Sequence, residues 1–231
     1  MKAKISVRLA NRCAFYISVP TNPPPFSLLR LADPNQVTVS RSKMDLPPNF
    51  SKIFQFMSLV GQLKRVRRTG WVKRNVSNPE SVSDHMYRMS LLAFLAEPSA
   101  GLDRERCIKL ALVHDMAESI VGDLTPSDNV CKQEKHRREE TAMKHISGLV
   151  GDRIGNELFQ LWEEYELQTS KEAEFVKDLD KFEMIMQAYE YEQLDKKPKY
   201  LQEFFDSTRG LFKTSQVQSW VEELEKIRDS P

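Results

Sequence analysis

The stretch LALVHDMAESIVGDLTP at residues 110–126 decides how this chain is expected to fold. Together with the residues just before it, the stretch is apolar on almost all sides, which predicts a central, buried helix. One helical turn holds about 3.6 residues, so His114 and Glu118 would share a face, with Asp115 about 100° around the axis. Charged groups in such a place are costly unless something pairs with them. Imidazole and carboxylate groups on one side of a buried helix therefore point to a divalent cation.

The residues that follow the predicted helix extend the same idea. Gly122 is expected to end the helix, because glycine readily adopts the conformations found after a helix C-terminus. Asp123 then lies just beyond the end, near the face that carries His114 and Glu118.

The chain outside this stretch also has helical periodicity, starting from residue 50. Ser81 with Asp84, and Thr169 with Glu172, have the spacing of capping boxes, and Asp103 is a candidate N-cap of the central helix. The expected helices span residues 50–63, 81–98, 103–122, 127–148, 154–165, 169–197, 200–211 and 217–227, with an extended loop at 71–79. No alternating strand pattern or internal repeat follows residue 50. The predicted fold is all-α, a single-domain helical array over residues 44–231.

The composition fits such a fold and excludes several classes of protein. The 231 residues are 40% hydrophobic, which is enough for one globular domain with a sizeable core. No apolar run reaches the roughly 18 residues of a membrane span, so we expect no membrane partner. The cysteines are odd in number and none forms a CxxC pair, which indicates a reducing compartment and no disulfide framework.

Charge is distributed unevenly along the chain. Seven Lys and Arg residues and one Asp precede Met44, a net charge of +6, which leaves −5 for the remainder because the whole chain carries +1. A mildly acidic body argues against nucleic-acid binding, since surfaces that bind nucleic acid are basic. Residues 1–43 are also rich in hydroxyl side chains and proline, which is typical of a transit peptide for a chloroplast or mitochondrion. The alternatives are an extension without a targeting role, and a cytoplasmic form that starts at Met44.

Two further residues join the central stretch as candidate ligands. His85 lies on the apolar side of the helix expected at 81–98, and Asp180 lies on the inner face of the helix at 169–197. Each has a plain structural explanation, because buried polar groups usually find a hydrogen-bond or ion-pair partner. Together with His114 and Asp115, they offer two imidazoles and two carboxylates from three helices. That donor set suits a mononuclear metal site with open positions for water and substrate.

The order of these residues resembles a known family. His85, the His114-Asp115 pair and Asp180 in KDLDKFE follow the H…HD…D signature of the HD-domain phosphohydrolase superfamily. The stretches RTGWVKRNVSNPESVSDHMYRM, LALVHDMAESIVGDLTP and EKHRREE are similar to those of the HD-domain 5'-deoxynucleotidases of bacteria and eukaryotes. The resemblance covers about residues 50–191. It implies an all-helical homodimer that removes the 5'-phosphate from deoxyribonucleoside monophosphates.

The resemblance also implies roles for individual residues. The matching metal ligands are His85, His114, Asp115 and Asp180. Glu118 matches the catalytic carboxylate, and Asp123 matches a second acidic residue that contacts substrate or, with Glu118 and Leu124, a second cation. The matching substrate-contacting residues are Arg68, Trp71, Arg74, Asp123, Leu124, Thr125 and Pro126. Which arginine takes the phosphate stays open, as does the choice between a substrate-packing and a core role for Trp71.

The chemistry implied by the resemblance agrees with these residue types. Two His and two Asp ligands accept Mn, Co, Fe, Zn or Ni, and Mg is a candidate for a second site. Such an ion lowers the pKa of bound water from about 15.7 toward about 7. Glu118 would hold or deprotonate the water, or protonate the leaving oxygen, and an arginine would clamp the phosphoryl oxygens. Basic residues at 132–138 are interpreted as a solvated helix face, with one phosphate contact among them as the alternative.

Two other functions remain open from the sequence. The chain could be an HD phosphohydrolase of another nucleotide class, acting on triphosphates, cyclic dinucleotides or alarmones. It could instead be a non-catalytic helical dimer stabilised by a structural metal. Glu118 and Asp123 favour an enzyme, because a structural site with four ligands would not need them.

Overall fold

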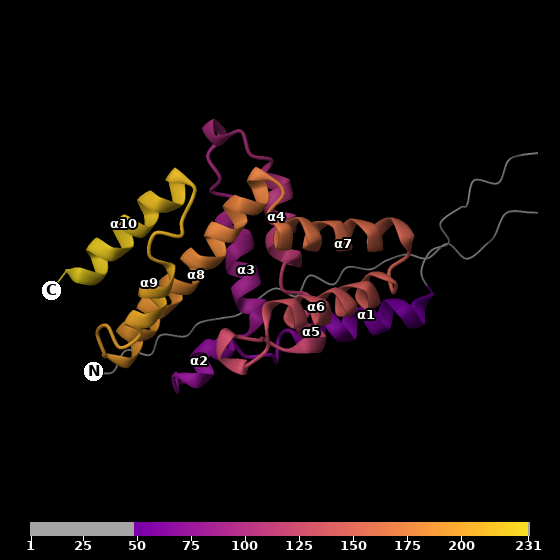
Figure 1. Ribbon diagram of the computed structural model, residues 1–231, viewed down its shortest axis with the longest axis horizontal. Helices are drawn as coiled ribbons and strands as arrows, with labels where there is room; N and C mark the ends of the chain where they lie inside the picture. The colour runs from indigo at the N-terminus through magenta and orange to yellow at the C-terminus, as the bar shows by residue number, and fades with distance from the viewer. Residues whose placement is uncertain (1–48, 231) are drawn as a thin grey trace, which may run out of the picture. The chain divides into compact units, whose positions relative to one another are not determined.

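The structure is a computed structural model that describes residues 49–230. The transit peptide expected at residues 1–43 and the alternative start at Met44 lie outside the described residues. Within them the predicted all-α class is confirmed, with one isolated bridge between Arg67 and Ser81 as the only extended pairing in the described part of the chain. The α-helices are α1 Phe50–Gln62, α2 Thr69–Lys73, α3 Val82–Ala93, α4 Arg104–Val113, α5 Glu118–Val121, α6 Lys132–Ser147, α7 Asp152–Leu167, α8 Lys171–Asp195, α9 Gln202–Thr208 and α10 Ser215–Asp229 (Figure 1). Short 3-10 turns occupy Pro98–Ala100 and Pro126–Asp128.

The long helix α8 organises the packing of the helical unit. It contacts α3, α4, α7, α9 and α10, and α3 also packs directly on α4. Met89, Leu110 and Leu179, one from each of α3, α4 and α8, are fully buried where these helices meet. Burial of this kind supplies most of the stability of such an array, because the hydrophobic effect scales with the apolar area removed from water. The three helices that form this core are also the ones that carry the predicted metal ligands.

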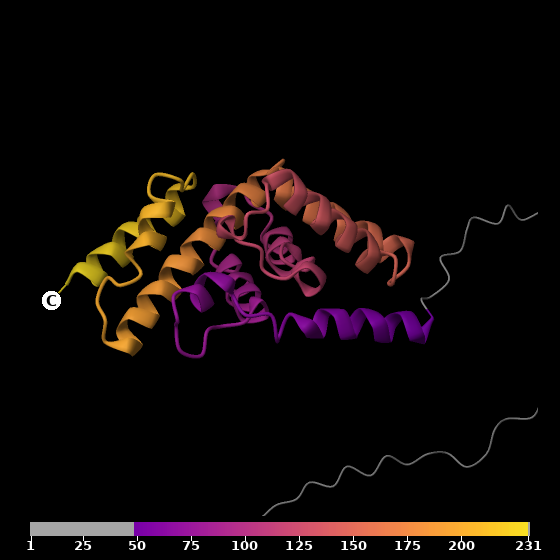
Figure 2. The ribbon, with the colours of Figure 1, turned by 60° about the horizontal axis from the view of Figure 1, so that its bottom comes forward.

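Helix α1 lies at the margin of this unit. Figure 2 shows it running along one edge, and none of its residues is buried. Of the helices that the structure describes, none has both the length and the apolar character that crossing a bilayer requires.

Several helix ends are where the sequence predicts them. Ser81 and Asp84 form the expected capping box, with the Asp84 carboxylate accepting the Ser81 N–H at 2.8 Å. Asp103 caps α4 by accepting the N–H of Arg106 at 3.1 Å. Such caps satisfy backbone donors that have no partner within the helix, so they act locally and are visible in sequence.

The prediction of one continuous central helix over 103–122 is wrong. Helix α4 ends at Val113, and a turn leads into the short α5. In this turn the N–H of Met116 bonds to the carbonyl of Val113, and that of Glu118 to the carbonyl of Asp115, three residues back instead of four. Adjacent residues on a regular α-helix point about 100° apart. In this turn Nε2 of His114 and Oδ2 of Asp115 come to lie 3.1 Å apart, so these sequence neighbours share one site.

Four other boundaries also differ from the prediction. Helix α3 ends at Ala93 and not near 98. The expected loop at 71–79 begins with α2, because the buried Trp71 ring anchors a helical turn there. Helix α6 starts at Lys132 instead of 127 or 128, since a 3-10 turn and Asn129 at φ 56° interrupt the helical path. Helix α8 is capped by Ser170, whose hydroxyl accepts the N–H of Ala173, and not by Thr169.

Candidate active site and metal centre

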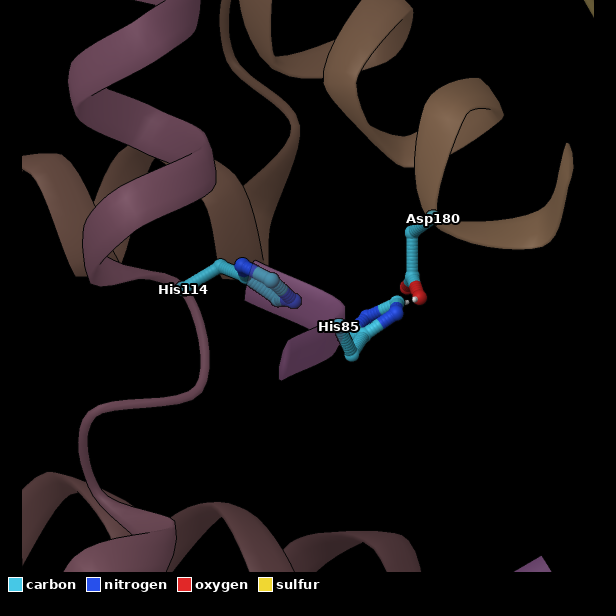
Figure 3. A group of neighbouring side chains, drawn as sticks. All are labelled: His85, His114 and Asp180. Atoms are coloured by element: carbon cyan, nitrogen blue, oxygen red, sulfur yellow. Dashed lines mark ion pairs between the residues drawn. The ribbon is translucent and has the colours of Figure 1, made fainter. Parts of the chain in front are cut away.

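The structure brings the four predicted metal ligands together. His85 comes from α3, His114 and Asp115 from the turn after α4, and Asp180 from α8. Nε2 of His85 lies 3.3 Å from Oδ1 of Asp180 and 3.9 Å from Oδ2 of Asp115. Nε2 of His114 lies 3.1 Å from Oδ2 of Asp115. Figure 3 shows the His114 ring directed toward His85, with the Asp180 carboxylate beside the His85 ring, and ligand atoms of these three residues all lie within 4.8 Å of one another.

The two histidines present the same ring nitrogen to this point. Nδ1 of His85 lies 2.5 Å from Oε2 of Glu183, and Nδ1 of His114 lies 2.9 Å from the carbonyl oxygen of Ala111. Both acceptors favour a proton on Nδ1 and leave Nε2 as the ligand atom. Within residues 49–230 both Nε2 atoms are buried without a hydrogen-bond partner. Since buried polar atoms are normally paired, this arrangement fits metal ligation.

Asp180 is held on the side away from His85. Its Oδ2 accepts hydrogen bonds from the Tyr165 hydroxyl at 2.6 Å and from the Lys177 amine at 3.0 Å, which leaves Oδ1 facing His85. Burial alone would raise the pKa of Asp180, but Lys177 and His85 bring the pKa well below its usual value. Asp180 is therefore oriented and anionic, which suits the predicted role of metal ligand.

The surrounding charges favour a cation at the centre. Burial would raise the pKa of Asp115, yet His114 and Arg68 outweigh it and lower the pKa below its usual value. Burial and Arg68 lower the pKa of His85, whereas Glu183 and Asp180 raise it to about 9. The carboxylates thus stabilise positive charge at the imidazole. Two carboxylates and two imidazoles are a donor set for a divalent ion such as Zn or Mn.

Glu118 lies at the start of α5, beside the ligands. Its side chain is buried and lines the same cavity as His114 and Asp115, and its Oε2 has no hydrogen-bond partner among the described residues. Burial raises the pKa of Glu118, and the nearby carboxylates of Asp115 and Asp123 raise it further, well above its usual value. A buried carboxyl that favours its protonated form next to a ligand cluster is suited to proton transfer.

The segment after α5 is tied to α2. Oδ2 of Asp123 accepts the backbone N–H of Thr69 at 2.6 Å, and the Thr69 hydroxyl donates to the Asp123 carbonyl oxygen at 2.7 Å. Asp123, Leu124 and Thr125 line the cavity, and Pro126 begins the following 3-10 turn. The predicted substrate-contacting segment therefore forms one wall, and its position depends on α2.

The two arginines in question both line the cavity but are held differently. Nη1 of Arg68 lies 3.6 Å from Oδ2 of Asp115, beyond ordinary hydrogen-bond length. Burial lowers the pKa of Arg68, but the surrounding carboxylates, with Asp115 first, raise it above its usual value. Arg74 instead forms a bidentate pair with Glu203 on α9. Arg68 is thus the arginine next to the ligand cluster.

Trp71 is almost fully enclosed. The side chain is 1% exposed, its indole N–H donates to Oε1 of Glu80 at 2.9 Å, and its ring packs against Tyr191 and Phe204. The ring also contributes to the cavity wall. This burial is compatible with the core role that the sequence left open, and leaves only a narrow part of the ring available to a ligand.

The cavity lined by His114, Asp115, Glu118 and Asp180 has a volume of about 490 Å³. Cavities of roughly 300–1,000 Å³ are typical of small-molecule sites. The sequence left Lys135 within a basic cluster for which a phosphate contact was the alternative role, and it assigned no site role to several other residues of the lining, among them Glu139, Tyr165, Glu166, Lys177, Met184, Phe204 and Ser207. It also missed Glu183 behind His85, although the spacing of Glu183 three residues after Asp180 places both on neighbouring positions of one helix face.

Comparisons with known proteins agree with this geometry. The family model described as "HD domain" matches residues 60–220. The "5'-deoxynucleotidase HDDC2" of Homo sapiens is 58% identical over 178 residues, covering 77% of this chain and 87% of that protein. The "5'-deoxynucleotidase YGK1" of Saccharomyces cerevisiae is 41% identical over 187 residues, covering 79% of this chain and 85% of that protein.

Solved structures show the same fold. A conserved hypothetical protein from Pyrococcus furiosus aligns with a TM-score of 0.63 and 35% identity, covering 77% of this chain and 99% of that one. The HD domain-containing protein YGK1 aligns with a TM-score of 0.54 and 32% identity, covering 77% of this chain and 85% of that one. With its ligand cluster formed from the H…HD…D residues, this chain belongs to the HD-domain family, in the group that contains the curated 5'-deoxynucleotidases.

Proposed function

We propose that the protein is a metal-dependent 5'-deoxynucleotidase, which hydrolyses deoxyribonucleoside 5'-monophosphates to deoxyribonucleosides and phosphate. The names of its relatives support this reaction at 41–58% identity over most of the chain. The observation that carries the proposal is the pair of buried Nε2 atoms of His85 and His114, which have no hydrogen-bond partner among the residues that the structure describes. They lie next to Asp115 and Asp180, which line one cavity with His114 and Glu118.

His85, His114, Asp115 and Asp180 would hold the catalytic cation. Candidates are Mn, Co, Fe, Zn and Ni, because all five accept mixed nitrogen and oxygen ligands. A divalent ion bound there supplies positive charge beside the phosphoryl group and makes water more acidic. A second cation, with Mg as the candidate, would use Glu118, Asp123 and the Leu124 carbonyl. It would require Glu118 to release its proton, and Oδ1 of Asp123 would serve because Oδ2 accepts the Thr69 N–H.

Glu118 is the proposed proton-transfer residue. Water forms a new bond to phosphorus, the bond from phosphorus to the 5'-oxygen breaks, and that oxygen needs a proton. Burial and the neighbouring Asp115 raise the pKa of Glu118 well above its usual value, which favours the protonated form of this carboxyl. Glu118 donates this proton to the leaving oxygen and regains one from the attacking water.

Arg68 is the proposed arginine for the phosphate. It lies beside the ligand cluster and is not committed to a close bidentate partner, whereas Arg74 is paired with Glu203. A guanidinium can contact two phosphoryl oxygens at once, which fixes the orientation of the group as well as its charge.

The test is release of inorganic phosphate from dAMP, dGMP, dCMP and TMP and from the matching ribonucleotides, after chelation and with each metal restored. We expect release from the deoxy substrates and much less from the ribo forms. Pyrophosphate or other products from triphosphates, cyclic dinucleotides or alarmones would support the alternative HD phosphohydrolase. No turnover of any nucleotide by folded, metal-loaded protein would support the structural-metal alternative.

We also propose that the protein works as a homodimer. An apolar groove of about 470 Å³ lies between α1, α3, α4 and α7, and exposed apolar residues of α1 continue beyond it. Its apolar lining includes Phe56, Val60, Leu112, Met116 and Leu158. Contiguous exposed apolar surface commonly marks an interface. Light scattering should give twice the chain mass, and Leu112→Glu should lower it to the chain mass.

A further inference from the structure

The cavity contains four cationic side chains, and they differ in how firmly each is already paired. Arg74 is bidentate to Glu203, and Lys177 donates to Tyr165 at 2.9 Å and to Asp180 at 3.0 Å. Arg68 and Lys135 are held more loosely, at 3.6 Å from Asp115 and 3.4 Å from Glu139 respectively. These two cations are therefore the ones able to exchange their present contacts for an anionic ligand.

Lys135 approaches Glu118 from a different element than Arg68 does. It lies in the first turn of α6, while Arg68 precedes α2, and both line the cavity with Glu118, Asp115 and Asp123. Burial lowers the pKa of Lys135, but Glu139 and Glu118 raise it above its usual value, so the amine carries its charge. The Lys135 side chain is 39% exposed and has one long ion pair within the described residues, so its ammonium is free to contact a ligand in the cavity.

We propose that Lys135 binds the phosphoryl group of the substrate from the α6 side of the cavity, with Glu139 holding the ammonium in place one turn along the helix. This inference rests on the proposed function, because it concerns the same substrate and the same cavity. It selects one residue from the basic cluster at 132–138, whose Arg137 and Arg138 pair with Glu134 at the surface.

The arrangement explains how a dianion enters a cavity rich in carboxylates. Asp115, Asp123 and Asp180 would repel a phosphate monoester, and the ammonium of Lys135 offsets that repulsion at the point where Glu118 must reach the leaving oxygen. A neutral deoxynucleoside product has no such attraction to Lys135. The residue thus distinguishes substrate from nucleoside product by charge.

The experiment compares Lys135→Gln and Lys135→Met with Lys144→Gln in metal-loaded protein. Lys144 is the matched control because it also forms an i,i+4-spaced pair on α6, with Glu140 at 2.6 Å, but is exposed outside the cavity. The measurements are the Kd of inorganic phosphate by calorimetry, the KM and kcat for dAMP, and the Kd of the metal. The Lys135→Arg variant tests whether a positive charge at this position is enough to restore phosphate binding.

We expect both neutral Lys135 variants to weaken phosphate binding and raise KM by about 10-fold or more, the effect of losing one charge-assisted contact. Metal affinity should stay unchanged, Lys135→Arg should recover much of the loss, and Lys144→Gln should match the wild type. Metal-loaded Lys135→Gln and Lys135→Met proteins that bind phosphate as tightly as the wild type would overturn the inference. If the wild type hydrolyses no deoxynucleotide, the proposed function fails, while the phosphate Kd still decides whether Lys135 binds the anion.

Discussion

Nδ1 of the His85 ring lies 2.5 Å from Oε2 of Glu183, a fully buried carboxylate on the same helix as Asp180. Arg88 donates to the other oxygen of Glu183 at 2.8 Å, so both carboxylate oxygens are engaged. One element, α8, thus supplies a direct ligand and the group that orients a second ligand. Partners of this kind fix the tautomer and direction of a metal-binding histidine.

Replacing Glu183 with Gln should weaken metal binding by about 10–100-fold, the usual effect of removing such a partner. The amide keeps the shape but removes the charge that favours the His85 proton on Nδ1. Calorimetric titration with Mn or Zn measures the change. Glu190→Gln is the control, because Glu190 also accepts from Arg88, at 2.6 Å, but touches neither histidine. Equal metal affinities for both variants and the wild type would show that Glu183 does not contribute to metal binding through His85.

Glu118→Gln should lower kcat by about 10²–10⁴-fold, the range for loss of a positioned proton-transfer group. Metal affinity should fall little, because the four ligands keep their positions and partners. Parallel measurement of kcat for dAMP and of metal content separates the two effects. A variant with wild-type kcat would show that proton transfer takes place elsewhere.

Thr69→Val should destabilise the wall formed by the segment after α5. The change removes the hydroxyl that donates to the Asp123 carbonyl at 2.7 Å, which typically costs about 1 kcal/mol. We expect a Tm lower by about 2–4 °C and a raised KM for dAMP. Thr141→Val is matched, since its hydroxyl also donates to a backbone carbonyl, that of Arg137 at 2.8 Å, but at an exposed position on α6. A KM change of equal size in both variants would contradict a specific role for the Thr69 contact.

Glu139→Gln should raise stability at high pH more than at low pH. Burial is the main cause that raises the pKa of Glu139 from 4.5 to about 7, against the opposing effect of Lys135. The folded wild type binds this proton more tightly than the unfolded chain does. Protonated Glu139 therefore contributes its whole stabilisation below about pH 4.5, and this contribution is lost as the pH rises to about 7. Glutamine does not titrate, so the variant does not lose this stability. At pH 8 its free energy of unfolding should exceed that of the wild type by at most about 3 kcal/mol.

Thermal unfolding of Glu139→Gln and wild type at pH 5, 6, 7 and 8 measures this difference. The gap in Tm should widen across the series. Glu140→Gln serves as control, because the Lys144 hydrogen bond lowers the pKa of Glu140 instead of raising it. A gap that stays constant or narrows with rising pH would refute the titration assigned to Glu139.

Features fixed by local interactions could be predicted from sequence. The Ser81–Asp84 capping box and the Asp103 cap involve residues three positions apart, so the pattern alone identifies them. The break after Val113 could not be predicted in this way. It coincides with tertiary contacts that His114 and Asp115 make with each other and with His85 on α3, and tertiary context of this kind overrides local helical periodicity.

In the candidate site, too, some features follow from local sequence and others only from tertiary packing. The spacing of His85, His114, Asp115 and Asp180 pointed to a metal centre because the motif resembles that of a family. Lys135 and Glu183 both lie in stretches that resemble the family, EKHRREE and KDLDKFE, but their individual roles depend on how α6 and α8 lie against the rest of the unit. Their contributions became visible only from distances to Glu139 and His85.

The measurement that tests the account most directly is the rate of phosphate release from dAMP by chelated protein as one divalent metal is titrated back. We predict no release from the chelated protein, recovery that is complete when the His85, His114, Asp115 and Asp180 site is filled, and no recovery in Asp180→Asn. Phosphate release that is unaffected by chelation, or folded and metal-loaded wild type that releases no phosphate, would contradict the account.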